Sequence, residues 1–230
     1  MRIIVAISAA LCLTASATFA KLSSDEVKRL NEATTIISEM RNAPDNGIPQ
    51  DLWAKAQCVV VIPSMKKAAF LVGGEYGSGV MSCRTGTDWS SPVFMQLAKG
   101  SVGFQIGAQS TDLVLLIMNR RGIDKLLSDK VSLGADISIA AGPVGRSASA
   151  ATDAQLSAEI LSYSRSQGLF AGVNLSGGVL KPDKDADANA YGSNANASEI
   201  VSGTQRAALS AAVPFLNALR KNGGTAAPAN

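Results

Sequence analysis

The stretch that decides the fold is Ala68-Ala69-Phe70-Leu71-Val72-Gly73-Gly74-Glu75-Tyr76-Gly77-Ser78-Gly79-Val80-Met81-Ser82-Cys83-Arg84. Strand-forming residues run into a glycine cluster, and strand-forming residues follow it. Glycine permits positive φ and close backbone approach, so the cluster predicts a bulged or sharply bent hairpin. The glycine order matches neither G-x-G-x-x-G nor G-x-x-x-x-G-K-[ST], and no helix follows to hold a phosphate, which argues against nucleotide binding.

The hairpin lies within a series of further predicted strands. Continuous or alternating apolar runs occupy residues 58–62, 93–97, 101–108, 113–118, 131–140, 160–164 and 169–175. Helical patterns follow the capping box Ser23-x-x-Glu26 and the cap residue Asn119, and extend from Glu199 to Leu219 with a kink or restart at Pro214. The sum predicts an α+β fold: a strongly curled, mainly antiparallel sheet or partly open barrel with helices at both chain ends.

The chain begins with a pattern typical of export. A basic residue, an apolar run and small residues predict a signal peptide over residues 1–20, with cleavage after Ala17 or Ala20. The remaining residues 21–222 are long enough for one domain, and 223–230 are expected to form a disordered tail. We therefore expect an exported protein, periplasmic or extracellular, and peripheral to any membrane.

Composition excludes several function classes. The formal charge of +3 falls to +2 without Arg2, which is too small for a general nucleic-acid binder. The sequence contains no histidine, which excludes Ser–His–Asp and Cys–His catalysis and histidine-ligated zinc. Carboxylates, lysines and cysteines show no recognisable catalytic spacing. We expect a protein that is not an enzyme and needs no cofactor.

Two cysteines remain after signal cleavage, Cys58 and Cys83. Export places them in an oxidising compartment, so we predict a disulfide between the segments that flank the hairpin. Closing such a loop stabilises a fold by about 3 kcal/mol in the chain-entropy model. The alternative is two separate buried thiols, since free cysteine packs well in a core.

Basic residues supply the candidate lipid site. Pro63-Ser64 is expected to stop the strand at 58–62, which places Lys66 and Lys67 in the following turn. Arg120 and Arg121 follow the apolar run at 113–118, so the two pairs are predicted to meet at one end of the sheet and hold a lipid phosphate. Solvated, edge-protecting residues are the alternative reading. Arg146, in a glycine-rich turn, is a further candidate for an anion or for a salt bridge.

An acidic segment offers a candidate calcium site. Asp183, Asp185 and Asp187 have the alternating spacing of oxygen ligands in a calcium loop. Ala188 stands where such a loop needs glycine, and Asn194 where it needs glutamate. The alternative is a solvated acidic loop without metal.

Several collinear blocks resemble the SYLF-domain family over residues 22–202. They include residues 56–63, the glycine cluster with Cys83-Arg84, Trp89-Ser90-x-Pro92, residues 101–107, 133–136, 142–146 and 163–172. The resemblance implies a lipid-binding module whose eukaryotic relatives bind phosphoinositides and actin filaments. We expect binding to anionic lipid or a membrane surface through basic loops rather than the first helix, and no contact with cytoplasmic actin. The alternative is a structural or protein-interaction domain of the envelope.

Overall fold

The protein is a curled sheet flanked by helices. Its computed structural model describes residues 22–41, 47–69, 72–102, 109–127, 130–145, 157–166, 169–207 and 209–223. The predicted signal peptide and residues 224–230 of the predicted tail lie outside these ranges. The helices are α1 (Ser24–Arg41), α2 (Gln50–Lys55), α3 (Arg120–Leu126), α5 (Lys184–Tyr191), α6 (Ala197–Ser202) and α7 (Val213–Gly223), with a 3-10 turn η2 (Ser210–Ala212). In the described part of the chain, no helix is both long and apolar enough to cross a bilayer.

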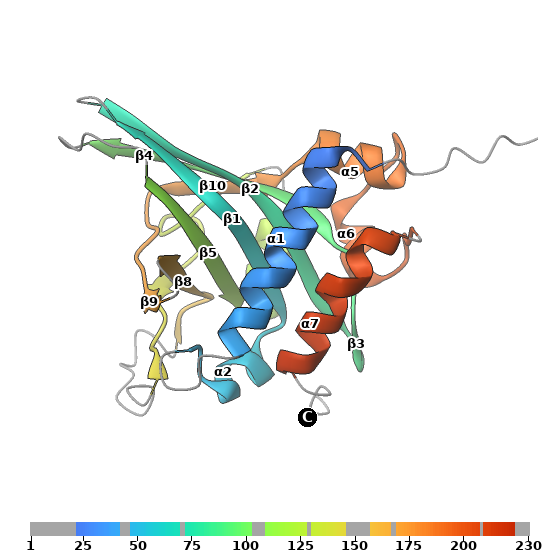
Figure 1. Cartoon of the computed structure of the whole chain (residues 1–230), viewed down its shortest axis with the longest axis horizontal. Coiled ribbons are helices and arrows are strands. Elements are labelled where there is room, and N and C mark those ends of the chain that lie inside the picture. The colour runs from blue at the N-terminus through green and yellow to red at the C-terminus, as the bar shows by residue number, and fades with distance from the viewer. Residues whose placement is uncertain are drawn as a thin grey trace, which may run out of the picture.

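The strands form one sheet in the order β6-β10-β4-β2-β1-β5-β8-β7, with β3 paired to β2 and β9 to β8. Their bounds are β1 (Cys58–Ala69), β2 (Val72–Thr85), β3 (Asp88–Trp89), β4 (Val93–Val102), β5 (Gln109–Ile117), β6 (Val131–Ser132), β7 (Ile139–Ala141), β8 (Ile160–Ser166), β9 (Leu169–Gly172) and β10 (Gly178–Pro182). Pairing is antiparallel except between β7 and β8. The predicted α+β class and curled, mainly antiparallel sheet are confirmed (Figure 1).

The glycine-rich hairpin exists, but its glycines lie inside β2 rather than at the turn. Strand β1 continues through Pro63 and Ser64, where the register shifts at a bulge and Ser64 has φ 49°. A Cβ on Gly79 would lie 1.9 Å from the Val61 carbonyl oxygen, and one on Gly77 would lie 2.4 Å from Ile62 Cγ2. The glycines therefore let the bulged strand press against β2, which bends the ribbon. The predicted strand stop at Pro63 is wrong, because the bulge absorbs the residue without ending the pairing.

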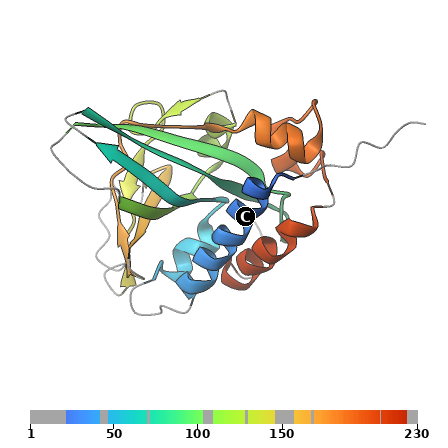
Figure 2. The same cartoon turned by 45° about the horizontal axis from the view of Figure 1, so that its top comes forward.

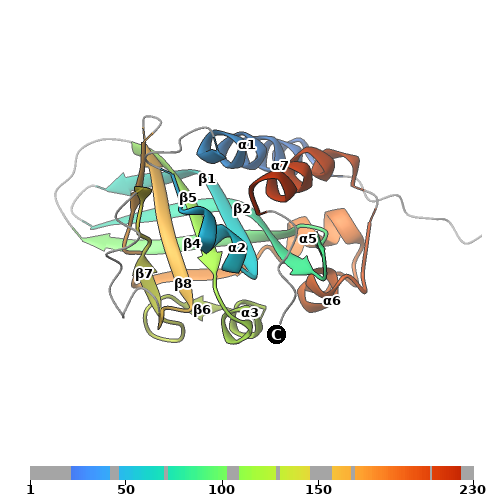
Figure 3. The ribbon, with the colours of Figure 1, turned by 90° about the horizontal axis from the view of Figure 1, so that it is seen from below.

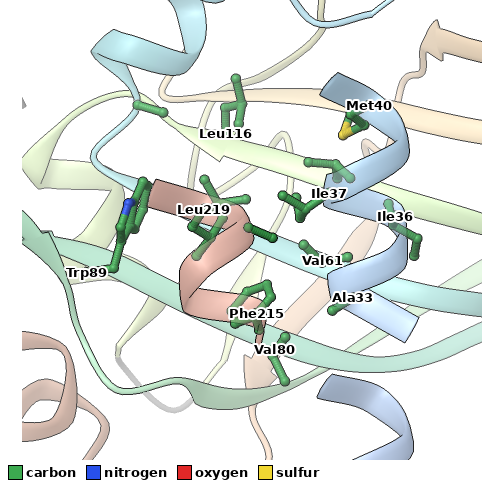
Figure 4. Close-up of a cluster of buried hydrophobic side chains, with 14 of the residues drawn as sticks. Ala33, Ile36, Ile37, Met40, Val61, Val80, Trp89, Leu116, Phe215 and Leu219 are labelled. Atoms are coloured by element: carbon green, nitrogen blue, oxygen red, sulfur yellow. The ribbon is translucent and has the colours of Figure 1, made fainter. Parts of the chain in front are cut away.

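Alternate residues of each strand enter two separate cores. On the outer face, α1 and α7 pack side by side over the sheet (Figure 2) and bury a cluster that includes Ile37, Val61, Val80, Phe215 and Leu219 (Figure 4). The predicted first helix is thus a core element, and its capping box is present: the Glu26 amide donates to Ser23 Oγ at 3.3 Å. This packing agrees with the expectation that the first helix is not the lipid-binding element.

The inner face of the curl holds the second core. It collects side chains from β1, β2, β4, β5, β8 and β10, and helices α3 and α6 contribute at one end. Figure 3 shows this arrangement along the curl, with α1 and α7 on one side and α3 with β6 on the other. Apolar side chains from these elements fill the middle of the curl.

The last predicted helical stretch, from Glu199 to Leu219, is broken in two. Helix α6 ends at Gly203, whose φ of 79° is the left-handed conformation that glycine adopts without strain. Helix α7 begins at Val213, so Pro214 lies in its first turn, where its missing N–H costs nothing. The predicted restart at Pro214 is confirmed.

Candidate functional site: the lysine end of the curled sheet

The strand register places the two predicted basic pairs at opposite ends of the sheet. Lys66 pairs with Ser110 on β5, whereas Cys58 at the other end of β1 pairs with Ile117, just before Arg120 and Arg121. At about 3.3 Å per residue, eight residues of strand separate the ends by roughly 26 Å. The prediction that the pairs meet is wrong, because β1 and β5 are antiparallel and each pair follows a different strand end.

The bulge at Ser64 sets the direction of both lysines. Met65 belongs to the inner core, so Lys67 lies on the inner face and Lys66 on the outer face with α1. Both lysines therefore lie within β1 rather than in a turn. Lys66 is exposed and lies opposite Tyr76 on β2, which is 49% exposed.

A row of three charges crosses the inner face at this end. Glu75 pairs with Lys67 on one neighbouring strand and with Lys99 on the other. The Lys67 ammonium lies 3.4 Å from the Glu75 carboxylate, and Lys99 Nζ donates to the Asn174 carbonyl oxygen at 3.2 Å. Two cations flank one anion, so the row carries a net charge of +1.

We call this region the lysine end, defined by Lys66, Lys67, Lys99, Tyr76 and Leu169. Leu169 opens β9 at the same end, since β8 pairs with β5 through Arg165 and Asp112. Among the described residues, the large hydrophobic side chains classed as exposed are Tyr76, Leu169 and Val213. Two of these three lie at the lysine end. Figure 1 shows the paired ends of β1 and β2 extending past α1, with the end of β4 beside them.

The opposite end is a structural region of mixed charge. Asn119 caps α3 by accepting from the Gly122 amide, as predicted. Arg120 is exposed and forms an exposed ion pair with Asp124 at 3.5 Å, and Arg121 is exposed. These arginines share their surroundings with an acidic partner, which weakens the case for an anion site there.

Arg84 has a structural role near these arginines. Its Nε donates to the Ala56 carbonyl oxygen at 2.9 Å and its Nη2 to that of Trp53 at 3.2 Å. The guanidinium lies 4.6 Å from the centre of the Trp89 ring, and burial lowers its pKa. Arg84 thereby joins the end of α2 to β2 and β3.

The predicted disulfide is present. Cys58 and Cys83 are directly opposite each other on β1 and β2 and are bonded, with both side chains buried in the inner core. The bond fixes the base of the hairpin at the end away from the lysines.

The acidic segment is a helix, so the expectation of a loop is wrong. Asp183 caps α5: it accepts from the Ala186 amide and forms a 2.7 Å ion pair with Arg29 of α1. Asp187 faces the sheet and accepts from the Phe94 amide at 2.8 Å, while Asp185 is exposed. The helix forms because Asp183 satisfies its first turn. Within the described ranges, no group of three or more acidic or cysteine side chains is placed to hold a metal ion.

Burial strongly perturbs Asp187. Burial away from solvent is the main cause that raises the pKa of this carboxyl group to about 7, and the nearby carboxylates of Asp183 and Glu26 add to it. The hydrogen bond from the Phe94 amide acts in the opposite direction and lowers the pKa. This carboxyl group joins α5 to β4 beneath α1, so its ionisation state bears on how the helices hold the sheet. Arg146, the remaining predicted site residue, lies outside the described residues.

Sequence reasoning missed Glu75 and Lys99. Neither belongs to a basic pair or a recognisable motif, and they are brought beside Lys67 only by the register of three strands. The one available signal was alternation: within β4, Lys99 follows the inward-facing Leu97 by two residues.

Comparison with known proteins places the chain in a family. Residues 98–222, more than half of the chain, match the family described as Las17-binding protein actin regulator, Ysc84. The chain belongs to this SYLF family. This confirms the resemblance of the sequence blocks.

The relatives are longer proteins. The SYLF chain is 38% identical to SH3 domain-containing YSC84-like protein 1 of Xenopus laevis over 167 residues, 72% of this chain and 49% of the relative. It is 38% identical to LAS seventeen-binding protein 3 of Saccharomyces cerevisiae over 168 residues, 70% of this chain and 36% of the relative. It is 35% identical to the human SH3 domain-containing YSC84-like protein 1 over 178 residues, which are 76% of this chain and 51% of the relative. The chain thus spans about half or less of the length of these relatives.

Proposed function

We propose that this SYLF protein is a non-enzymatic module of the bacterial envelope that binds anionic lipid surfaces through the lysine end. The observation that carries the proposal is the coincidence, at one end of the sheet, of three lysines with two exposed large hydrophobic side chains. Basic residues beside an anionic bilayer each contribute about 1 kcal/mol, and exposed apolar groups add burial at the interface.

The proposal assigns lipid contact to strand ends rather than to a helix. Helix α1 buries its apolar stripe against the sheet, so this stripe is not available to a bilayer unless the helix detaches. Lys66 and Tyr76 need no rearrangement, because both are already exposed on neighbouring strands. Export, as predicted from residues 1–20, directs the surface toward envelope lipids.

Vesicle flotation tests this function. The full chain should float with vesicles in proportion to their anionic lipid content at low salt, and the bound fraction should fall as salt screens the charges. Neutral vesicles are the matched control, and with them the protein should stay in the bottom fraction of the gradient. Absence of flotation at every lipid composition would refute the lipid function.

A protein-binding role is the second candidate, favoured by the relatives whose names describe binding to Las17. In this chain such a role requires an exported protein partner. A crosslinking experiment on intact cells distinguishes the two: one defined protein adduct together with absent flotation supports the second candidate, and flotation without an adduct supports the first.

A further inference from the structure

We infer that the inner face at the lysine end holds a binding cavity for a single-chain amphiphile with one carboxylate, such as a fatty acid. This inference deepens the proposed lipid function, but it does not require a bilayer. The cavity measures about 310 Å³, at the lower limit of small-molecule pockets. Its lining comes from β1, β2, β4, β5 and β8, so it lies at the mouth of the curl rather than on an outer surface.

The cavity is divided into a polar rim and an apolar floor. Lys67, Glu75 and Lys99 form the charged rim. The floor consists of Met65, Leu113 and Leu175, which are 4%, 2% and 3% exposed and belong to the inner core. A ligand with a charged head and an apolar tail matches this division, since barrel mouths bind such molecules with the tail directed inward.

Charge selects the head group. The row Lys67–Glu75–Lys99 has a net charge of +1, and the two lysine backbones are roughly 10 Å apart because one strand separates them. A single carboxylate neutralises the row and can take a charge-assisted bond from either ammonium. A second negative charge on the head would approach Glu75, so a dianionic phosphate monoester is disfavoured.

Gly77 lies next to Met65, which belongs to the floor of the cavity. It lies on β2 between Glu75 and Gly79, and its missing Cβ leaves the space that Ile62 and Met65 occupy. This close packing holds Met65 at the base of the cavity. Thr111, opposite Met65 on β5, also lines the cavity and bears no charge, which makes it the residue for a steric test.

Calorimetric titration of the full chain with decanoate at pH 8, without vesicles, tests the inference. At this pH the ligand carboxylate is ionised, and saturable one-to-one binding is the expected result. Lys99→Gln should weaken binding roughly ten-fold, through loss of a charge-assisted contact. Decanol, which lacks the charge, and decyl phosphate, which carries more of it, should each bind at least ten-fold more weakly than decanoate.

Thr111→Phe is the steric variant, chosen because phenylalanine fits a strand and fills the mouth without changing charge. It should abolish decanoate binding while leaving vesicle flotation and the unfolding transition of the protein as in the parent. Undetectable decanoate binding by the parent, equal affinity for decanol, or undiminished binding by Thr111→Phe would each overturn the inference. Since flotation is measured separately, its failure would count against the proposed membrane association alone.

Discussion

Replacing Asp187 with Asn should make the protein less sensitive to alkaline pH. Asp187 is 3% exposed, and the pKa of its carboxyl group is raised from 3.8 to about 7, first by burial and then by Asp183 and Glu26. A carboxyl group whose folded pKa is raised binds its proton more tightly in the folded state. Its stabilising contribution is complete below pH 3.8 and is lost as pH rises through 7.

The size of the effect follows from the two pKa values. At roughly 1.4 kcal/mol per pH unit, the gap between 3.8 and about 7 corresponds to about 4 kcal/mol of folding free energy lost between pH 4 and pH 8. Asparagine has nearly the same shape, does not titrate, and its Oδ1 can still accept from the Phe94 amide. The free energy of unfolding of Asp187→Asn minus that of the parent should therefore rise by about 4 kcal/mol from pH 4 to pH 8.

Urea unfolding followed by tryptophan fluorescence at pH 4, 6 and 8 measures this difference, since Trp53 and Trp89 are both buried. Asp185→Asn is the matched control, because Asp185 is exposed on the same helix. The control should show no pH-dependent difference from the parent. A difference between Asp187→Asn and parent that stays constant across the three pH values would refute the assignment of a buried, protonatable carboxyl group at this position.

Three further predictions concern the hairpin and the acidic helix. Replacing Cys58 and Cys83 together with alanine should lower the free energy of unfolding by about 3 kcal/mol, because the disulfide closes a loop of 25 residues; two free thiols in the unreduced, denatured parent would contradict it. Gly79→Ala should cost roughly 3 kcal/mol in urea unfolding, since its Cβ meets the Val61 backbone, whereas Gly100→Ala, with open space around it, should cost less than about 1 kcal/mol; equal costs would refute the close approach. Millimolar calcium should leave the melting temperature unchanged, because Asp183 and Asp187 already accept from backbone amides; an increase that a chelator reverses would show a metal site.

Local signals in the sequence predicted the elements that depend on local chemistry. The hydrogen bonds of the capping box at Ser23 and Glu26 and of the cap at Asn119 join residues three positions apart. Both partners of each bond can therefore be recognised in a short stretch of sequence. The disulfide also followed from counting, since removal of the predicted signal peptide would leave Cys58 and Cys83 as the available partners.

Features that depend on register were not predictable in the same way. The bulge at Ser64 shifts the pairing of β1 and decides that Lys66 and Lys67 face opposite sides. No local pattern contains that shift, because it arises from the contact of β1 with the glycines of β2. Likewise, the acidic spacing of residues 183–189 fits both a ligand loop and a capped helix. The helix forms in this protein because Asp183 caps α5 and pairs with Arg29.

The most direct test of the central claim compares two double variants in vesicle flotation at low salt. Lys66→Gln with Lys99→Gln removes two charges from the lysine end, while Arg120→Gln with Arg121→Gln removes the same charge from the opposite end. At about 1 kcal/mol per charge, the lysine variant should bind anionic vesicles roughly thirty-fold more weakly than the parent, and the arginine variant should bind as the parent does. Equal weakening of both variants, or loss in the arginine variant alone, would contradict the assignment of membrane binding to the lysine end.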